Sequence, residues 1–304
     1  MTKTTLRYLN KHKIEYLSNV FSQTITWISV VITFFASLIA ILPNDSAIQI
    51  GMINIANFIF NSPLNIFLFI FVFLTTSAIV NFPRMKTTYK DNITDIKVII
   101  ECCDLLKQKG LKIIHCVDTF DCELGSIISA NSLHGLFLKH AEQNKVDIDS
   151  QIDDYMSHNQ NYETDSTLPG RTKRFPLATL CPVSINNDMF CFAAFTHLQS
   201  DGSITITKAE YISYLKNLWL NLAEPKIRQE EINVAVMGNR FVDLPSDFST
   251  EQKIDLMIQS FYAAARERSC CRTLRICIHE NNATEVDFQH YNTIIGHLSK
   301  RPIF

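Results

Sequence analysis

The chain has 304 residues, 47 % of them apolar, and its 28 Lys and Arg residues nearly balance 30 Asp and Glu residues. This length is sufficient for one sizeable hydrophobic core and an additional segment. The formal net charge of −2 gives no overall attraction to nucleic acid. The nine cysteines include no C-x-x-C pair, which argues against zinc ribbons and fingers, and the composition argues against fibrous or wholly disordered classes.

Two long stretches near the N-terminus carry no charged residue. They lie between Glu15 and Asp45 and between Asp45 and Arg84. A helix that crosses a bilayer needs about 20 apolar residues and satisfies its own backbone hydrogen bonds in lipid. We therefore predict two membrane spans, over residues 24–42 and 64–82. A pair of buried soluble helices and a cleaved signal peptide in place of the first span are the alternatives.

Basic residues predict how the spans are oriented. They flank the pair on its outer sides, as Lys3, Arg7, Lys11 and Lys13 before the first span and Arg84, Lys86 and Lys90 after the second. The positive-inside rule places both termini in the cytoplasm. Residues 1–23 are then a cytosolic amphipathic segment, residues 43–62 a short external loop, and the nine cysteines free thiols in a reducing compartment.

The predicted spans contain no ionisable residue, which disfavours a transporter or a proton relay. Such spans are typical of an anchor, or of a subunit that forms a pore only after assembly. Ser29, Thr33 and Ser37 recur at a spacing of four and are either a helix–helix contact or simply tolerated polar residues.

Residues 83–304 alternate between strand and helix patterns. Strands are predicted over residues 111–117, 175–183, 189–197, 232–237 and 274–279. Helices are predicted over residues 96–109 and 133–141, after the capping boxes Thr207-x-x-Glu210 and Ser249-x-x-Gln252, and from Thr284 to about residue 299. Residues 142–172 are polar and predict a long loop or lid. The alternation predicts an α/β fold, a mixed sheet with helices on both faces.

Four segments follow strands or open a helix, where ligands collect in open α/β sheets. They are residues 118–121, 131–135, 238–241 and 279–281. The backbone amides at a helix N-terminus suit a phosphate, Arg240 offers a bidentate donor and Phe241 a stacking face. The basic cluster of Arg171, Lys173 and Arg174 could reach a phosphate from the lid. Each segment also has an ordinary structural explanation as a turn, a cap or a solvated basic face.

No catalytic motif is present. The sequence has no G-x-S-x-G, G-x-x-x-x-G-K-[ST], H-E-x-x-H or G-x-G-x-x-G pattern. The paired cysteines at 102–103 and 270–271 do not indicate a thiol nucleophile. We therefore predict no enzymatic activity, no cofactor and no metal.

The order of several short motifs resembles a known family. These motifs are KIIHCVDTFD, NSLHG at a helix start, PLATL, MFCFAAFTHL, NLW and VAVMGNRFVDLP. Together with the spans they resemble the membrane effector of Thoeris anti-phage systems, in which two transmembrane helices precede a macro-like domain.

The resemblance implies a function and a ligand. Macro domains bind ADP-ribose and related nucleotides. In these systems a partner TIR-domain enzyme consumes NAD and makes an ADP-ribose-derived messenger, for this type a histidine–ADP-ribose conjugate. The effector binds it, forms homo-oligomers and damages the membrane, which causes growth arrest or abortive infection.

The resemblance also implies roles for single residues. Asp118 and Phe120 would stand near the adenosine or its ribose. The diphosphate would be held from the helix side by Asn131, Ser132, Leu133, His134 and Gly135, and from the opposite loop by Gly238, Asn239, Arg240 and Phe241. The glycine run of ordinary macro domains is reduced to Gly135, which favours sensing over hydrolysis. The alternatives are a membrane-anchored ADP-ribosyl hydrolase, and a structural partner that docks another protein through residues 142–172.

Overall fold

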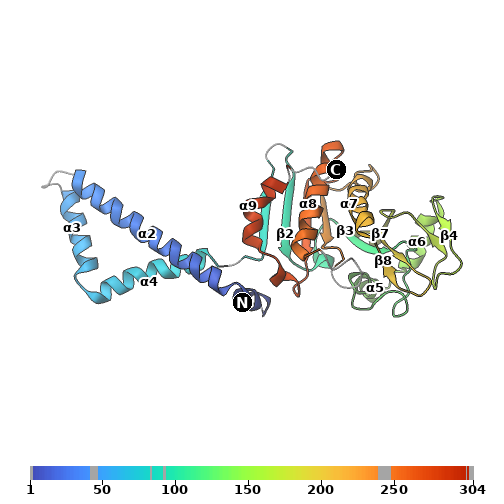
Figure 1. Ribbon diagram of the computed structural model, residues 1–304, viewed down its shortest axis with the longest axis horizontal. Coiled ribbons are helices and arrows are strands. Elements are labelled where there is room, and N and C mark those ends of the chain that lie inside the picture. The colour runs from blue at the N-terminus through green and yellow to red at the C-terminus, as the bar shows by residue number, and fades with distance from the viewer. Residues whose placement is uncertain are drawn as a thin grey trace. The chain divides into compact units, whose positions relative to one another are not determined.

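The computed structural model describes residues 3–41, 47–82, 84–91, 94–238, 248–298 and 300 (Figure 1). The chain divides into two compact units, Met1–Arg84 and Met85–Phe304. We describe each unit separately.

The regular secondary structure described in the first unit is helical. Its helices are α1 (Lys3–Lys11), α2 (Lys13–Ile41), α3 (Ala47–Phe60) and α4 (Pro63–Val80). The predicted span over residues 24–42 lies in the longer α2, apart from Leu42, which is outside the described residues, and α4 covers most of the span predicted over 64–82. The prediction of a loop over residues 43–62 is wrong, because the apolar run from residue 47 forms α3.

Two helices are long and apolar enough to cross a membrane, at Lys13–Leu38 and Pro63–Val80. Only 11 % and 6 % of their apolar windows are buried within the chain, so they are not core helices of this unit. Large apolar side chains on both are open, with Val30 62 % and Phe67 61 % exposed. Exposed apolar surfaces of this kind are typical of membrane or protein–protein contacts.

Polar side chains join α2 to α4 at one end of the pair. The buried Ser77 hydroxyl donates to the Val20 carbonyl over 2.9 Å, and the Tyr16 hydroxyl donates to the Ala78 carbonyl over 2.9 Å. The Asn81 amide donates to the side-chain oxygen of Gln23. Such interhelical hydrogen bonds stabilise helix pairs in an apolar environment.

The second unit is built on a mixed sheet. Its strands, in sheet order, are β1 (Lys86–Lys90), β2 (Lys97–Cys102), β10 (Thr273–Ile278), β9 (Glu231–Ala235), β3 (Leu111–Val117), β7 (Asp188–Leu198) and β6 (Leu180–Ile185), with β8 (Ile204–Thr205) on β7. The five central strands are parallel, whereas β1 and β6 are antiparallel to their neighbours. The carboxyl ends of the parallel strands therefore meet at one edge.

Helices cover both faces of this sheet, as predicted. One face carries α7 (Lys208–Leu222), α8 (Thr250–Glu267) and α9 (Phe288–Leu298), which lie side by side in Figure 1. The other carries α5 (Leu133–Gln143) and α6 (Ile148–Ser157). Phe137 of α5 meets Phe190 and Phe192 of β7, and Tyr214 of α7 meets Phe195 on the opposite face of that strand. Aromatic side chains thus fill both layers of the core.

Several local predictions are confirmed. The strand over residues 111–117 is β3, and α5 begins at Leu133 behind its cap Ser132. Both capping boxes, Thr207 with Glu210 and Ser249 with Gln252, are formed.

The helix predicted over residues 96–109 is wrong. Residues 97–102 form β2, followed by the short 3-10 helix η1 (Leu105–Lys107) that Asp104 caps. The β-branched run of Val98, Ile99 and Ile100 lies between β1 and β10, and all three side chains are buried. Tertiary pairing decides the conformation of such a short apolar run.

The loop predicted over residues 142–172 is also wrong in part. It contains α6, capped by Asp147, whose buried residues Ile148, Ile152 and Met156 recur at helical spacing. It also contains β4 (Glu163–Thr164), which pairs with β5 (Lys173–Arg174). We call residues 163–175 the strap.

Two predicted boundaries are corrected as well. The strand predicted from residue 175 begins at Leu180, because Ala178 has a positive φ of 67° and interrupts it. Thr284 lies in the 3-10 helix η2 (Ala283–Glu285), and α9 begins only at Phe288. The Asp287 carboxylate accepts from the backbone amides of the next turn and starts α9.

Candidate functional site

The predicted ligand segments collect at the carboxyl edge of the parallel strands. Residues 118–121 follow β3, residues 279–281 follow β10, and Gly238 lies after β9 with a positive φ of 73°. The Gly238 carbonyl accepts a hydrogen bond of 2.8 Å from Lys253 Nζ of α8. The predicted residues Asn239, Arg240 and Phe241 lie outside the described residues.

Asp118 is completely buried, and its carboxylate is fully engaged by the protein. It accepts from Arg174 Nη1 over 2.8 Å, from His197 Nδ1 over 2.7 Å and from the Leu198 amide over 3.1 Å. A buried carboxylate is stable only with such partners. Asp118 therefore holds protein segments together, and its side chain has no exposed surface for a nucleotide.

His197, at the end of β7, lies between two carboxylates. Its Nε2 is 3.3 Å from Glu210 Oε1 of α7, on the side opposite Asp118. The hydrogen bond to Asp118 raises the pKa of His197, with further contributions from the charges of Asp118 and Glu210. Arg174 completes this charge cluster from the strap and also donates to the Leu198 carbonyl over 2.7 Å.

Phe120 is also buried, with 1 % of its surface exposed. Its φ of 56° is in the left-handed region, and its ring meets the edge of Phe175 at a centroid distance of 5.6 Å. Phe175 N–H donates to the Asp118 carbonyl over 2.9 Å. The turn after β3 thus carries the end of the strap.

Asp121 links the strap to the turn after β3 at a further residue, besides Arg174 and Phe175. Its buried carboxylate accepts from the Thr119 hydroxyl and, over 2.8 Å, from the Arg171 backbone amide. Burial raises the pKa of Asp121, and both hydrogen bonds oppose this shift. A Cβ on Gly170 would overlap the Asp121 carboxylate, so only glycine permits this close approach.

The N-terminus of α5 opens at the same edge. The Ser132 hydroxyl accepts from the Gly135 amide over 3.0 Å and donates to the Ser129 carbonyl. A Cβ on Gly135 would overlap that carbonyl, which gives this glycine a packing role. Within the described part of the chain, the backbone amides of Leu133 and His134 make no hydrogen bond. Two free amides at a helix N-terminus are suited to an anion.

The side chains of this segment point in different directions. Asn131 is exposed, whereas Leu133 packs partly against the core. His134 is buried with its ring 4.9 Å from that of Phe192, and burial lowers its pKa to about 3. The neutral His134 imidazole is therefore a core residue of α5.

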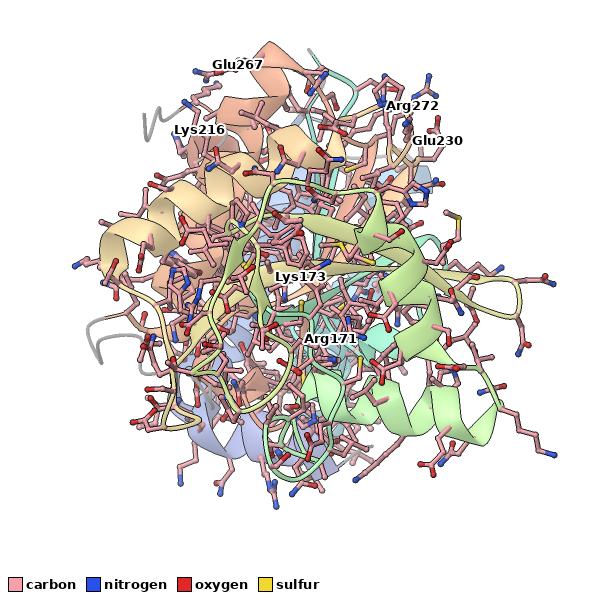
Figure 2. All side chains as sticks on the ribbon, turned by 90° about the vertical axis from the view of Figure 1, so that its right-hand side faces the viewer. Arg171, Lys173, Lys216, Glu230, Glu267 and Arg272 are labelled. Carbon is pink, nitrogen blue, oxygen red and sulfur yellow. The ribbon has the colours of Figure 1, made fainter. Side chains whose placement is uncertain are left out.

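A cavity of about 480 Å³ lies between α6 and the strap. Arg171 and Lys173, labelled in Figure 2, line it together with Thr119, Asp153, Met156, Ser157, Gly170, Thr172 and Phe175. Arg171 is paired with Asp149 at 2.6 Å and with Asp153 at 3.0 Å. Lys173 Nζ lies 4.6 Å from the centre of the Tyr162 ring. The predicted basic cluster is thus divided, since Arg174 binds Asp118 and only the other two line the cavity.

No group of three or more His, Cys, Asp or Glu side chains suited to a metal occurs among the described residues. None of the nine cysteines forms a disulfide bond. Sequence reasoning missed His197, the contact of Glu210 with His197 and the link between Asp121 and the strap. Their spacing along the chain carries no motif, and only the fold brings them to Asp118 and to the strap.

The family model of the Thoeris protein ThsA macro domain matches residues 98–279, which is more than half of the chain. The chain belongs to this family. The second unit of this Thoeris-type chain accordingly has the macro-domain fold, with the strand order and the two helical layers given above.

Solved structures similar to the chain include macrodomains of Oceanobacillus iheyensis. The macrodomain with ADP is 11 % identical, with 68 % of this chain and 95 % of that chain covered and a TM-score of 0.41. A mutant of the same macrodomain with ADPR is 12 % identical, with 71 % and 100 % covered and a TM-score of 0.42. No curated protein matches the chain.

Proposed function

We propose that the chain is a membrane effector of Thoeris anti-phage defence. It binds an ADP-ribose-derived messenger, such as a histidine–ADP-ribose conjugate, made by a TIR-domain enzyme that consumes NAD. The bound chain then forms homo-oligomers in the bacterial inner membrane and disrupts it. The observation that carries the proposal is the ThsA macro-domain family match in a chain whose first unit exposes two long apolar helices.

We assign the messenger to the carboxyl edge of the sheet. The free amides of Leu133 and His134 point out of the α5 N-terminus, where the helix dipole favours a diphosphate. Asn131 is exposed beside them. We propose that residues 238–241 also contribute to messenger binding, with Gly238 following β9 at the same edge. Arg240→Ala should weaken binding by about 1.5–3 kcal/mol, the contribution of a hydrogen bond to a charged group.

Asp118 and Phe120 have a positioning role in this proposal. Both are buried, and both fix the strap to the turn after β3. They set the shape of the site without touching the ligand.

The membrane part of the proposal follows from exposure and charge. In the first unit α2 and α4 leave their apolar side chains open, and basic residues flank the pair on both outer sides. We therefore propose a multi-pass chain with both termini in the cytoplasm. A messenger drives assembly only if it binds the assembled state more tightly than the monomer.

The test uses the full chain reconstituted in lipid vesicles. Calorimetry with ADP-ribose and with histidine–ADP-ribose should give saturable binding, and dye should leave the vesicles only when the preferred nucleotide is present. The absence of binding to both nucleotides would contradict the proposal. Release of ADP-ribose from an ADP-ribosylated protein would instead identify a hydrolase.

A further inference from the structure

Helix α3 and the residue after it, Asn61, whose N–H donates to the Asn57 carbonyl, carry asparagines on the side that faces away from the rest of the unit. Met52 is buried, and Ala56 and Ile59, on the same side, are partly covered where α3 contacts α2 and α4. At 3.6 residues per turn, positions 54, 57 and 61 lie on the opposite side. Asn54, Asn57 and Asn61 are all exposed. We call these three residues the asparagine stripe.

The surroundings of the stripe are apolar. No charged residue occurs from position 46 to position 83, and large side chains around the helix are open, with Phe58 70 % and Ile50 51 % exposed. With 14 residues, α3 is about 20 Å long, which is too short to cross a hydrocarbon core of about 30 Å. Because α3 joins two helices that are long enough to cross, it is held against the membrane in the proposed function.

The carboxamides of the stripe have no partner. Their side chains make no hydrogen bond to any residue that the structure describes. Two other asparagines of this unit are engaged, since Asn65 donates to the Phe58 carbonyl over 2.6 Å and Asn81 donates to Gln23. An amide without a partner in an apolar medium costs several kcal/mol, so the stripe favours any contact that satisfies it.

We propose that the asparagine stripe is a contact surface for a second copy of this chain. A carboxamide has both donor and acceptor groups, so the stripe is complementary to itself, and asparagines form such interhelical bonds in membranes. This proposal names the surface for the self-association in the proposed function and rests on it. It requires no new covalent chemistry and no ligand at α3.

The experiment compares three full-length proteins in lipid vesicles. They are the native chain, the variant Asn54→Leu/Asn57→Leu/Asn61→Leu, and the control Thr75→Val/Thr76→Val. The control hydroxyls are also exposed on a helix of this unit, but each already donates to a carbonyl of its own helix. Energy transfer between labelled copies is recorded at rising protein-to-lipid ratio, with and without ADP-ribose.

We expect the leucine variant to need at least a tenfold higher protein-to-lipid ratio for half-maximal transfer, and the control to match the native chain. Asn→Gln at the three positions should restore association, because glutamine keeps both groups. Equal association of the native chain and the leucine variant would overturn the proposal, as would the absence of any association of the native chain.

Two further readouts separate the possible failures. Nucleotide binding is measured on every variant. If no variant binds nucleotide but the leucine variant still associates less than the native chain, only the proposed function is contradicted. In an Asn57→Cys variant, a membrane-impermeant maleimide located by peptide mass spectrometry should not react at position 57. Its reaction there at every protein-to-lipid ratio would show that the stripe faces water and would overturn the contact surface.

Discussion

The two units of the chain place their apolar residues in opposite ways. In the second unit large side chains such as Trp219, Phe137 and Phe261 are completely buried between the sheet and its helices. In the first unit the apolar windows of α2 and α4 are almost entirely open. The second unit therefore carries its own core, whereas the first leaves the apolar side chains of α2 and α4 outside any core of its own. Substitutions in one unit should leave the other intact.

The largest effect should follow from Asp118→Ala. The change leaves Arg174 and His197 without their buried partner, and breaking a buried ion pair costs about 3–5 kcal/mol. Denaturant unfolding of the full chain in detergent measures this loss, followed by tryptophan fluorescence, to which the buried Trp219 contributes. Lys107→Ala, which removes an exposed ion pair with Asp104, should cost about 1 kcal/mol or less. A similar cost for both variants would contradict the role given to Asp118.

Ile32→Asp should affect only the first unit. Ile32 is 46 % exposed in α2, and a charge at the centre of a membrane helix costs about 2.5–3.5 kcal/mol. We expect dye release from vesicles to disappear while nucleotide binding stays at the native level. Loss of both activities would show that the units do not act separately.

Gly170→Ala should destabilise the strap by about 1–3 kcal/mol, the usual cost of forcing extra atoms into a filled space. The new methyl group would meet the Asp121 carboxylate. In an Asp121→Ala background the same change should cost less, and a double-mutant cycle of unfolding free energies measures the difference. An equal cost in both backgrounds would place the clash elsewhere.

The smallest effect should be a pH dependence from His197. The pKa of His197 is higher in the folded chain than in the unfolded chain, because Asp118 binds the protonated ring. Its stabilising contribution is complete below the unfolded pKa of about 6.5 and is lost as the pH rises through the folded pKa. The difference in unfolding free energy between the native chain and His197→Gln should shrink over that range. A difference that grows with pH would reverse the assignment.

Local patterns were sufficient for much of the fold. The long apolar helices, β3 and both capping boxes each depend on residues that are close together in sequence. The structure contains all of these elements. The strand β2 and helix α6 were missed for opposite reasons. β2 is a short apolar run that its neighbours in the sheet hold extended, and α6 hides three buried residues in a polar stretch.

The candidate site was less predictable than the fold. Its position at the carboxyl edge follows from strand order, but the task of Asp118 depends on Arg174 and His197, which are 56 and 79 residues away in the chain. No spacing rule connects residues so distant. From the sequence alone, an aspartate at the end of a strand is easily interpreted as a ligand-binding residue. Its protein partners become known only when the fold brings the strands together.

The Asp118 carboxylate also determines how easily the cavity under the strap can change shape. To lift the strap, Arg174 would have to leave a carboxylate that has no access to solvent, and the energy of that separation is far above thermal energy. The backbone that carries Arg171 and Lys173 is therefore held in place, by Asp121 at Arg171 and by Asp118 at Arg174. A ligand that fits the cavity would therefore lose little binding free energy to rearrangement of the strap backbone.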